Sequence, residues 1–300
     1  MLGVTILGNN SAIPAHGRHP TAQIITTGED LLLFDCGEGT QIQILNYKIR
    51  RSRINHIFIS HLHGDHYFGL IGLLSSFALL NRIQPLHVYG PAPLKSLLEQ
   101  QFQLSETHIT FPFEFHAIEI DGLLLETPFY TVSCFSTKHR IECRGFIVRQ
   151  KKRKRKIIRH LAEQKNIPLD LYPILQQGED IQLEDGSVVP NETITIAAPA
   201  PKSYAFTADT LFDPEIVEHI KGVDLLYHEA TYPHALVDKA SARYHSTTKE
   251  AAEIARLAGV NKLLIGHFSA KFDDPLTFEE ESKEVFLNTE AAREGVTYLV

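Results

Sequence analysis

The segment HLHGDH, which begins at His61, places three histidines and one aspartate within six positions, directly after the apolar run INHIFIS. Imidazole and carboxylate groups are common zinc ligands, and no two of the three cysteines have the CxxC spacing of a thiolate site. His61 and His63 are two apart, so on an extended segment both side chains point the same way. Asp65 and His66 can then face a second ion where the chain turns into a helix after Gly69. The spacing therefore predicts two metal ions held by one loop.

Other side chains of ligand type end distant strands of the predicted fold. Open α/β sheets bind ligands in the crevice beyond the carboxyl ends of their strands, so side chains at those ends converge. We therefore expect one crevice to collect the residues that follow apolar strands, which are Asp35, His61, Asp209, His228 and His267, with His139 a few residues beyond another strand.

The chain has 16 histidines, and their number alone makes none of them a ligand. A lone histidine at a strand end is more often a packed or surface residue. That interpretation fits the isolated histidines, which are His87, His108, His116, His160, His219 and His234. It does not fit four ligand side chains within six positions, so HLHGDH is interpreted as a metal site.

Short apolar strands alternate with helices along most of the chain, which predicts a layered α/β fold with helices outside the sheets. Helices are expected at residues 69–80, 94–102 and 249–258. Thr247 and Glu250 have the spacing of a capping box for the last helix, and Gly259 is its stop signal. Strands are expected near VTILG, AQIITT, DLLLFDC, HIFIS, LHVYG, residues 129–134, TITIAA, SYAFTA, DLLYHE and KLLIGH.

The formal net charge is −7, but the charges are unevenly distributed. The run RQKKRKRKIIR, residues 149–159, holds eight basic and no acidic residues. The segment from about 149 to 190 also breaks the alternation of strands and helices, and connections this long are usually functional or mobile. We expect a single acidic domain, residues 1–300, with an inserted arm at about 149–190. The sequence shows neither a secretion signal nor a membrane span of roughly 20 apolar residues, which predicts a cytoplasmic protein without membrane contact.

HLHGDH resembles the HxHxDH signature of the metallo-β-lactamase superfamily. The resemblance implies a four-layer αβ/βα sandwich with two zinc ions at the edge where the two sheets meet. The implied ligands are His61, His63 and His139 for one ion and Asp65, His66 and His267 for the other, with Asp209 bridging both.

Longer motifs follow the same order along nearly the whole chain: LFDCGEGTQ, ISHLHGDHYFGL, AFTADT, HEATY, HST and IGHFS. Together they resemble ribonuclease Z, the endonuclease that removes 3′ trailers from tRNA precursors. The resemblance implies that a hydroxide bridging two zinc ions attacks the phosphodiester and leaves a 3′-hydroxyl on the tRNA. Asp65 is expected to orient the water or take its proton. His245, paired with Glu229, is expected to protonate the leaving 3′ oxygen, while Asp35 and His228 support the ligands.

The resemblance also places contacts with RNA. In ribonuclease Z an arm between the third metal histidine and the bridging aspartate grips the tRNA, usually from the partner subunit of a homodimer. The basic run lies in the same interval here, between His139 and Asp209. Lysine and arginine contacts to phosphate give sequence-independent affinity that falls with salt. The residues expected to contact precursor tRNA are Arg18, Lys151, Lys152, Arg153, Lys154, Arg155, Lys156 and Lys271.

Two other functions remain open from the sequence. The protein could hydrolyse small phosphodiesters or other esters, with the arm incidental to catalysis. It could instead be a non-catalytic RNA-binding relative. The presence of all seven predicted ligands disfavours that second alternative, because a binding module has no evident need for them.

Overall fold

The computed structural model describes residues 1–28 and 30–300, which form two compact units. The main unit consists of Met1–Glu126, Tyr130–Arg149 and Lys202–Val300. The inserted unit consists of Thr127–Phe129 and Gln150–Pro201, so it extends further along the chain than the segment expected for the arm. Within the described residues, no helix combines the length and the apolar character that crossing a membrane requires.

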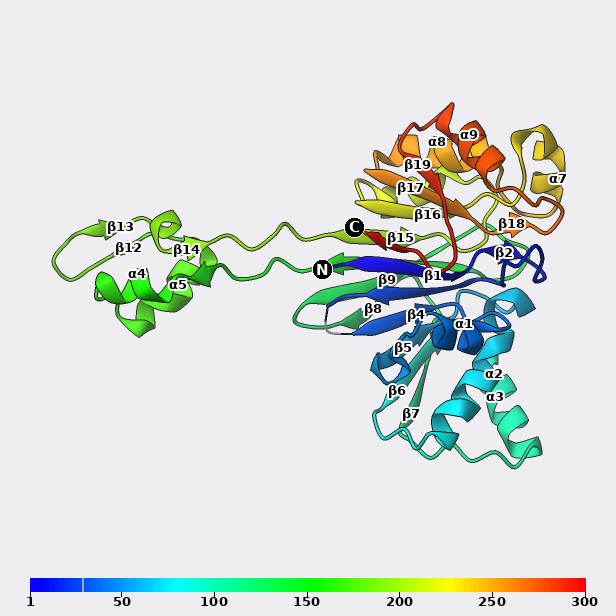
Figure 1. The fold of residues 1–300 in the computed structure, drawn as a ribbon, viewed down its shortest axis with the longest axis horizontal. Coiled ribbons are helices and arrows are strands. Elements are labelled where there is room, and N and C mark those ends of the chain that lie inside the picture. Colours follow the sequence, from blue (N-terminus) through cyan, green and yellow to red (C-terminus); the bar gives the residue numbers. More distant parts are fainter. Residues whose placement is uncertain (29) are drawn as a thin grey trace. The chain divides into compact units, whose positions relative to one another are not determined.

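Two seven-stranded sheets form the centre of the main unit (Figure 1). The first has the strand order β20-β1-β3-β4-β5-β6-β7, and β4 to β7 run parallel. The second has the order β19-β17-β16-β15-β10-β9-β8, in which β15, β16, β17 and β19 run parallel. The strands of the first sheet are β1 (Gly3–Gly8), β3 (Ala22–Thr26), β4 (Leu31–Phe34), β5 (Ile54–Phe58), β6 (Leu86–Gly90), β7 (Phe113–Ala117) and β20 (Thr297–Leu299). Those of the second are β8 (Gly122–Glu126), β9 (Tyr130–Ser136), β10 (Arg144–Gln150), β15 (Ser203–Phe206), β16 (Leu225–Glu229), β17 (Lys262–Gly266) and β19 (Thr289–Ala291).

Successive side chains of a strand point to opposite faces, so each sheet buries one face against the other sheet and the other face against helices. The main unit therefore has one inner core and two outer cores. On β4, Leu32 and Phe34 join the core between the sheets, whereas Leu33 packs with the helices. Phe34 meets Phe146 of the other sheet with ring centroids 5.1 Å apart. The outer face of the first sheet packs against α1 (Thr40–Asn46), α2 (Gly64–Leu79) and α3 (Pro93–Leu104), and that of the second against α6 (Val217–Ile220), α8 (Thr248–Ala258) and α9 (Leu276–Lys283). The predicted four-layer αβ/βα sandwich is confirmed.

The helix predicted to begin after Gly69 begins earlier than expected. Helix α2 starts at Gly64, so Asp65 and His66 lie in its first turn and not in a loop before it. The N-cap is His63, whose side chain makes no capping hydrogen bond, so the usual polar start signal is missing from the sequence. The prediction for α8 is confirmed, including its capping box and the left-handed Gly259 with φ of 60°.

Nine of the ten predicted strands lie in the two large sheets, and the strands of these sheets that were not predicted are β7, β8, β10, β19 and β20. Charged and polar residues interrupt the apolar pattern of β7 (FEFHA) and β10 (RGFIVRQ). The strand predicted at TITIAA does not belong to either large sheet. Only Thr195–Ile196 forms a strand there, β14, and it pairs with β11 (Lys156–Ile157).

The inserted unit has a small core of its own. Its remaining elements are α4 (Arg159–Gln164), α5 (Tyr172–Gln177), β12 (Ile181–Gln182) and β13 (Val188–Val189). They bury a cluster that consists of Ala162, Ile167, Leu175, Ile181, Val189 and Ile194. The segment is therefore an ordered subdomain rather than an irregular loop.

Helix α2 packs closely against the loop after β4, and two glycines allow this approach. The backbone N–H of Cys36 donates to the carbonyl oxygen of His66 at 2.7 Å, and that of Gly69 donates to Cys36 at 2.9 Å. A Cβ on Gly69 would lie 2.1 Å from the carbonyl oxygen of Gly37, and one on Gly37 would lie 2.5 Å from that of Asp65. The first turn of α2 is thus held against the β4 loop by contacts that tolerate no side chain.

We expect Gly69→Ala to lower the free energy of unfolding by about 1–3 kcal/mol, because overpacking a tight contact displaces backbone. Urea denaturation measures the loss. Gly72→Ala is the matched control, since it lies on the same helix and its Cβ would meet only the flexible Gln41 side chain. A Gly69→Ala protein as stable as the Gly72→Ala protein would contradict this account.

Candidate metal centre and active site

The structure brings all seven predicted metal ligands together. His61 follows β5, and His63, Asp65 and His66 lie at the start of α2. Asp209 and His267 follow β15 and β17, whose carboxyl ends lie at one edge because β15, β16 and β17 are parallel. His139 lies in the turn between β9 and β10. The convergence expected at the strand ends is therefore present.

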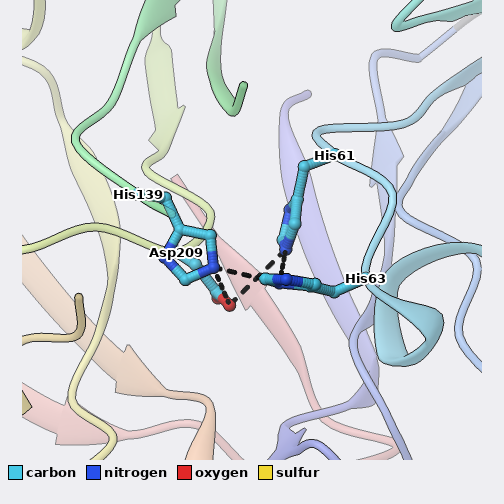
Figure 2. A group of neighbouring side chains, drawn as sticks. All are labelled: His61, His63, His139 and Asp209. Carbon is cyan, nitrogen blue, oxygen red and sulfur yellow. Dashed lines mark hydrogen bonds and ion pairs between the residues drawn. The ribbon is translucent and has the colours of Figure 1, made fainter. Parts of the chain in front are cut away.

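A first group consists of His61, His63 and His139 around Asp209 (Figure 2). Nδ1 of His63 lies 3.0 Å from Nε2 of His61 and 3.0 Å from Nε2 of His139. Oδ2 of Asp209 lies 3.6 Å from Nε2 of His61 and 3.8 Å from Nε2 of His139. Donors arranged tetrahedrally around one zinc ion lie about 3.3 Å apart. These four atoms therefore have the spacing of ligands of a single ion.

A second group consists of Asp65, His66 and His267. Oδ2 of Asp65 lies 3.3 Å from Nε2 of His267 and 3.6 Å from Nε2 of His66. The other oxygen of Asp209, Oδ1, lies 3.4 Å from Nε2 of His66 and 3.3 Å from Nε2 of His267. Asp209 thus presents one oxygen to each group of histidines, which is the arrangement of a bridging carboxylate.

Hydrogen bonds behind the rings fix which nitrogen carries the proton. Nδ1 of His66 lies 2.6 Å from Asp35, and a carboxylate only accepts, so Nδ1 donates. The hydroxyl of Ser60 donates to Asp35 at 2.9 Å and therefore accepts from Nδ1 of His61, also at 2.9 Å. The Nε2 atoms of His61 and His66 consequently keep their lone pairs for the centre.

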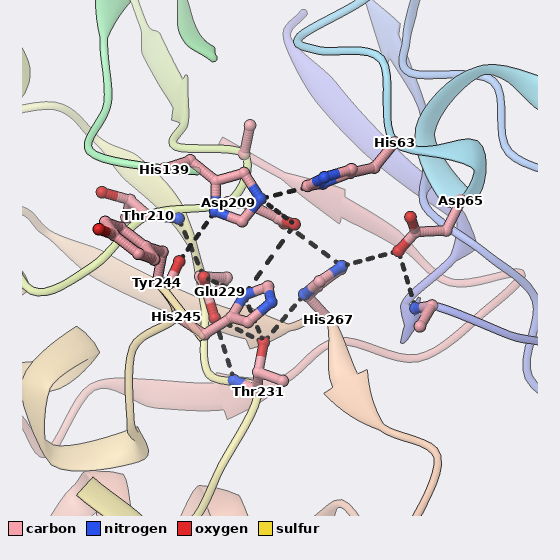
Figure 3. Close-up of polar contacts among 12 residues, drawn as sticks. His63, Asp65, His139, Asp209, Thr210, Glu229, Thr231, Tyr244, His245 and His267 are labelled. Atoms are coloured by element: carbon pink, nitrogen blue, oxygen red, sulfur yellow. Dashed lines mark hydrogen bonds and ion pairs between the residues drawn. The ribbon is translucent and has the colours of Figure 1, made fainter. Parts of the chain in front are cut away.

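Hydrogen bonds also fix which nitrogen carries the proton in His267 and His139, on the other side of the centre (Figure 3). The hydroxyl of Thr231 donates to buried Glu229 at 2.6 Å and accepts from Nδ1 of His267 at 2.9 Å. Nδ1 of His139 donates to the carbonyl oxygen of Tyr244 at 2.9 Å. Nε2 is thus the free nitrogen of these rings as well. His228, expected to support a ligand, instead donates from Nδ1 to the carbonyl oxygen of Glu229 at 2.7 Å.

The side chains present fit a divalent cation. Nε2 of His66 is buried and has no hydrogen-bond partner among the described residues. Burial lowers the pKa of His66, but without a cation in the centre Asp209, Asp65 and Asp35 outweigh burial and raise it well above its usual value. A metal ion bound at Nε2 would therefore displace a proton from that atom. Burial lowers the pKa of His63 to about 4, so that ring is neutral. Neutral imidazoles among buried carboxylates are a donor set for divalent metal ions.

His245 lies beside the centre and is paired with Glu229. Its Nδ1 donates to Oε1 of Glu229 at 2.8 Å, and Glu229 also accepts from the backbone N–H of Thr210 at 2.9 Å. Burial opposes a charge on His245, but the carboxylate of Glu229 outweighs burial and raises the pKa of His245 to about 9. The ring is therefore protonated at neutral pH, and it lines the cavity over the centre.

Two adjoining cavities open at the site. The first, of about 440 Å³, is lined by Asp65 and Asp209 among others, and the second, of about 590 Å³, shares His245 with it. The second is called the basic cavity here, because the cations that line it are Arg140, Lys239, Arg243 and Lys271. Partial burial and the positive charges of Lys271 and Arg243 lower the pKa of Lys239. An anion bound in the basic cavity would relieve this repulsion.

Of these four cations, the sequence analysis identified Lys271 alone. Lys239 and Arg243 stand four apart at α7 (Val237–Ala242), and Arg243 is its C-cap. Arg243 precedes His245 by two positions, and Arg140 directly follows His139. The sequence signal that could have identified Arg140 and Arg243 is thus their position next to predicted site residues.

Arg18, expected to contact RNA, makes its contacts within the main unit. Nε donates to Oδ1 of Asn10 at 2.9 Å, and the two Nη atoms donate to the carbonyl oxygens of Phe272 at 2.6 Å and Asp273 at 2.7 Å. The side chain therefore ties the N-terminal loop, which includes β2 (Asn10–Ser11), to the loop after β18 (Phe268–Ser269).

The six residues of the basic run that are expected to contact RNA, Lys151 to Lys156, lie in the inserted unit. Of these six, Lys152, Arg153, Lys154 and Lys156 are exposed, whereas Lys151 and Arg155 are half-buried. Nε of Arg155 donates to the hydroxyl of Thr195 at 2.7 Å, which ties it to β14. The guanidinium of Arg153 lies 5.6 Å from the centre of the Phe129 ring. Four of the six cations are thus presented to solvent.

The sequence is similar over nearly its whole length to curated proteins called ribonuclease Z. The one from Porphyromonas gingivalis is 42% identical over 293 residues, which cover 97% of this chain and 96% of that protein. The one from Bacteroides fragilis is 39% identical, with 97% of this chain and 96% of that protein covered. The family model described as Anti-Pycsar protein Apyc1 matches residues 2–157, just over half of the chain.

Solved structures show the same relationship. Human tRNase Z, short form, has a TM-score of 0.72 at 26% identity and covers 99% of both chains. A metallo-β-lactamase fold protein from Bacillus subtilis has a TM-score of 0.70 at 21% identity, with 99% of this chain and 98% of that chain covered, and it supports the fold alone. The predicted metallo-β-lactamase fold is therefore confirmed, and the identity with the curated relatives shows that the chain belongs to the ribonuclease Z family.

Proposed function

We propose that this protein is a metal-dependent endoribonuclease that removes 3′ trailers from tRNA precursors. Its membership of the ribonuclease Z family supports this function. The structural observation that carries it is Asp209, whose two oxygens face two separate groups of histidines. Two-metal centres with such a shared ligand serve in-line displacement at phosphodiesters.

We infer two zinc ions per chain. Histidine and carboxylate ligands are those of hydrolytic zinc sites. When bound, zinc would lower the pKa of a water molecule toward about 7 and polarise a phosphoryl oxygen. The proposed ligands are His61, His63 and His139 for one ion and Asp65, His66 and His267 for the other, with Asp209 shared.

Asp65 is proposed to orient the attacking water or accept its proton. Burial opposes ionisation, but His66 and His267 outweigh it and hold the pKa of Asp65 below its usual range. The backbone N–H of Ala12 donates to Oδ2 at 2.7 Å, and Oδ2 is also the oxygen that lies 3.3 Å from Nε2 of His267 in the second group of ligands. Oδ2 is therefore the proposed ligand oxygen, and Oδ1 is the oxygen that we assign to the water.

His245 is proposed to protonate the leaving 3′ oxygen. Its Nδ1 is held by Glu229, so Nε2 carries the proton that can be transferred. Glu229 is buried and keeps the ring in its charged form. A leaving alkoxide needs such an acid because it departs poorly without a proton.

The basic cavity and the basic run are proposed to hold the RNA. Cations contact phosphates without regard to sequence, which suits an enzyme that processes many tRNAs. The exposed cations of the inserted unit contrast with the acidic remainder of the chain. We also propose that the protein forms a homodimer, in which the inserted unit of one chain contacts tRNA bound to its partner. We propose that this dimer acts in the cytoplasm.

The direct test uses a labelled tRNA precursor with a 3′ extension, incubated with purified protein and zinc. We expect release of the trailer, a 3′-hydroxyl on the tRNA and a 5′-phosphate on the trailer, identified by end-group analysis. Chelation should stop the reaction, and Asp65→Ala should lower kcat by at least about 100-fold. Hydrolysis of bis(p-nitrophenyl) phosphate without trailer release would favour the small-phosphodiester alternative instead.

His245→Ala should lower kcat on the normal precursor by about 100- to 10,000-fold, the usual contribution of an acid. The loss should be far smaller on a precursor whose leaving 3′ oxygen is replaced by sulfur, because a thiolate departs without a proton. Single-turnover rates on both substrates measure the difference. His219→Ala, an exposed histidine outside the site, is the matched control. Equal losses on the two substrates would show that His245 positions the substrate rather than protonating it.

Changing Lys152, Arg153, Lys154 and Lys156 to alanine should weaken tRNA binding and its salt dependence. Each phosphate contact contributes about 0.7–0.9 to the slope of log affinity against log salt, so the magnitude of the slope should fall by up to about 3.6. Binding is measured by filter retention over a range of salt. The control variant neutralises four exposed cations of the main unit, which are Lys48, Arg50, Lys95 and Lys221. An unchanged slope in the first variant would refute the assigned role of the inserted unit.

A further inference from the structure

Four polar side chains lie together on one face of β5, β6 and β7, apart from the catalytic ligands. His56 of β5 pairs in register with His87 of β6, and His87 pairs with Glu114 of β7. His116 lies two residues beyond Glu114, so it points to the same face. His56 precedes His61 by five residues, which places the group about 16 Å back along the strand from the catalytic edge.

Three of these side chains bring one donor atom each to a common point. Nδ1 of His87 lies 3.1 Å from Nε2 of His116 and 3.4 Å from Oε2 of Glu114. Nε2 of His116 lies 3.9 Å from the same carboxylate oxygen. Tetrahedral zinc ligands lie about 3.3 Å apart. The donors of the candidate catalytic centre show a similar range, from 3.0 Å to 3.8 Å.

Hydrogen bonding alone accounts for only part of this arrangement. A neutral imidazole has one N–H, so Nδ1 of His87 can donate either to His116 or to Glu114. The distance of 3.9 Å between His116 and Glu114 exceeds the range of a hydrogen bond. A cation between the three donors would satisfy all of them at once.

The two imidazoles are held in place and available as ligands. The ring of His56 stacks on that of His87 with centroids 5.0 Å apart, and Tyr89 stacks on His116 at 4.4 Å. The side chains of His87, His116 and Glu114 are 25%, 38% and 58% exposed, which lets an ion enter from solvent.

We propose that His87, Glu114 and His116 form a second metal site, which binds a divalent transition metal ion such as zinc independently of the catalytic centre. Two imidazoles and one carboxylate favour zinc-like ions over magnesium or calcium, which prefer oxygen ligands. β7 is the last strand of its sheet, so a bound ion would link it to β6 and stabilise that edge. The contact between His87 and His116 shows that the two histidines are not isolated, and metal binding is the role that we propose for it.

The test compares zinc content at saturation in proteins that all keep the catalytic ligands. After equilibration with zinc and gel filtration, the wild-type protein should retain one more zinc ion per chain than a His87→Ala, His116→Ala double variant. Added zinc should also raise the melting temperature of the wild type more than that of the variant. Metal analysis and thermal unfolding provide the two readouts, and neither depends on activity.

Two further variants make the result specific. Glu114→Gln keeps the size of the side chain but removes the anionic donor, so it should weaken binding of the additional ion by about tenfold or more. His108→Ala, an exposed histidine outside the triad, should behave as the wild type. Equal zinc content and equal thermal response in the wild type, the double variant and Glu114→Gln would overturn the proposal. Trailer removal should be unchanged in these variants, which separates this site from the proposed function.

Discussion

The candidate metal centre depends on two buried carboxylates, Asp35 and Glu229, which determine where the protons of four histidines lie. Asp35 accepts from His66 directly and from His61 through the hydroxyl of Ser60. Glu229 accepts from His245 directly and, through the hydroxyl of Thr231, fixes the proton of His267. Each carboxylate thereby turns the unprotonated face of a ligand ring toward the centre. A buried carboxylate is costly without partners, and these partners are the ones that the metal centre needs in a fixed tautomer.

The two sheets divide the centre between them. The first sheet provides Asp35 and the HLHGDH segment, and the second provides His139, Asp209 and His267. The rings of Phe34 and Phe146 join the sheets in the core behind these residues. The spacing of the ligands is thus tied to the packing of the whole main unit. The glycines that admit α2 to the β4 loop are part of the same constraint, because α2 carries Asp65 and His66.

The distribution of charge complements this geometry. The chain as a whole is acidic, yet the basic cavity beside His245 and the basic run of the inserted unit both present cations. Carboxylates gather around the histidines of the candidate metal centre, and cations gather in the two regions where we propose that the RNA phosphates bind. The triad of His87, Glu114 and His116 adds a third local environment on the same sheet, built from two imidazoles and one carboxylate at its β7 end.

The sequence by itself predicted the layered α/β fold and the convergence of Asp209 and His267 on the HLHGDH segment, because these depend on local spacing and on polar residues at the ends of apolar strands. The division of the seven ligands between two ions and the pairing of His245 with Glu229 came from the resemblance to known families, because residues so far apart in the chain carry no local signal of their partners. The sequence did not determine that α2 begins at Gly64, since His63 caps the helix without a capping side chain. It also could not show that Asp35 and His267 adopt left-handed backbone conformations, with φ of 54° and 61°, because no glycine marks those positions. Only the tertiary structure decided that Arg18 ties two loops together, that Arg140, Lys239, Arg243 and Lys271 share a cavity, and that His87 meets Glu114 and His116. These groupings join residues from separate strands and loops, and their distances are set by packing in three dimensions rather than by separation along the chain.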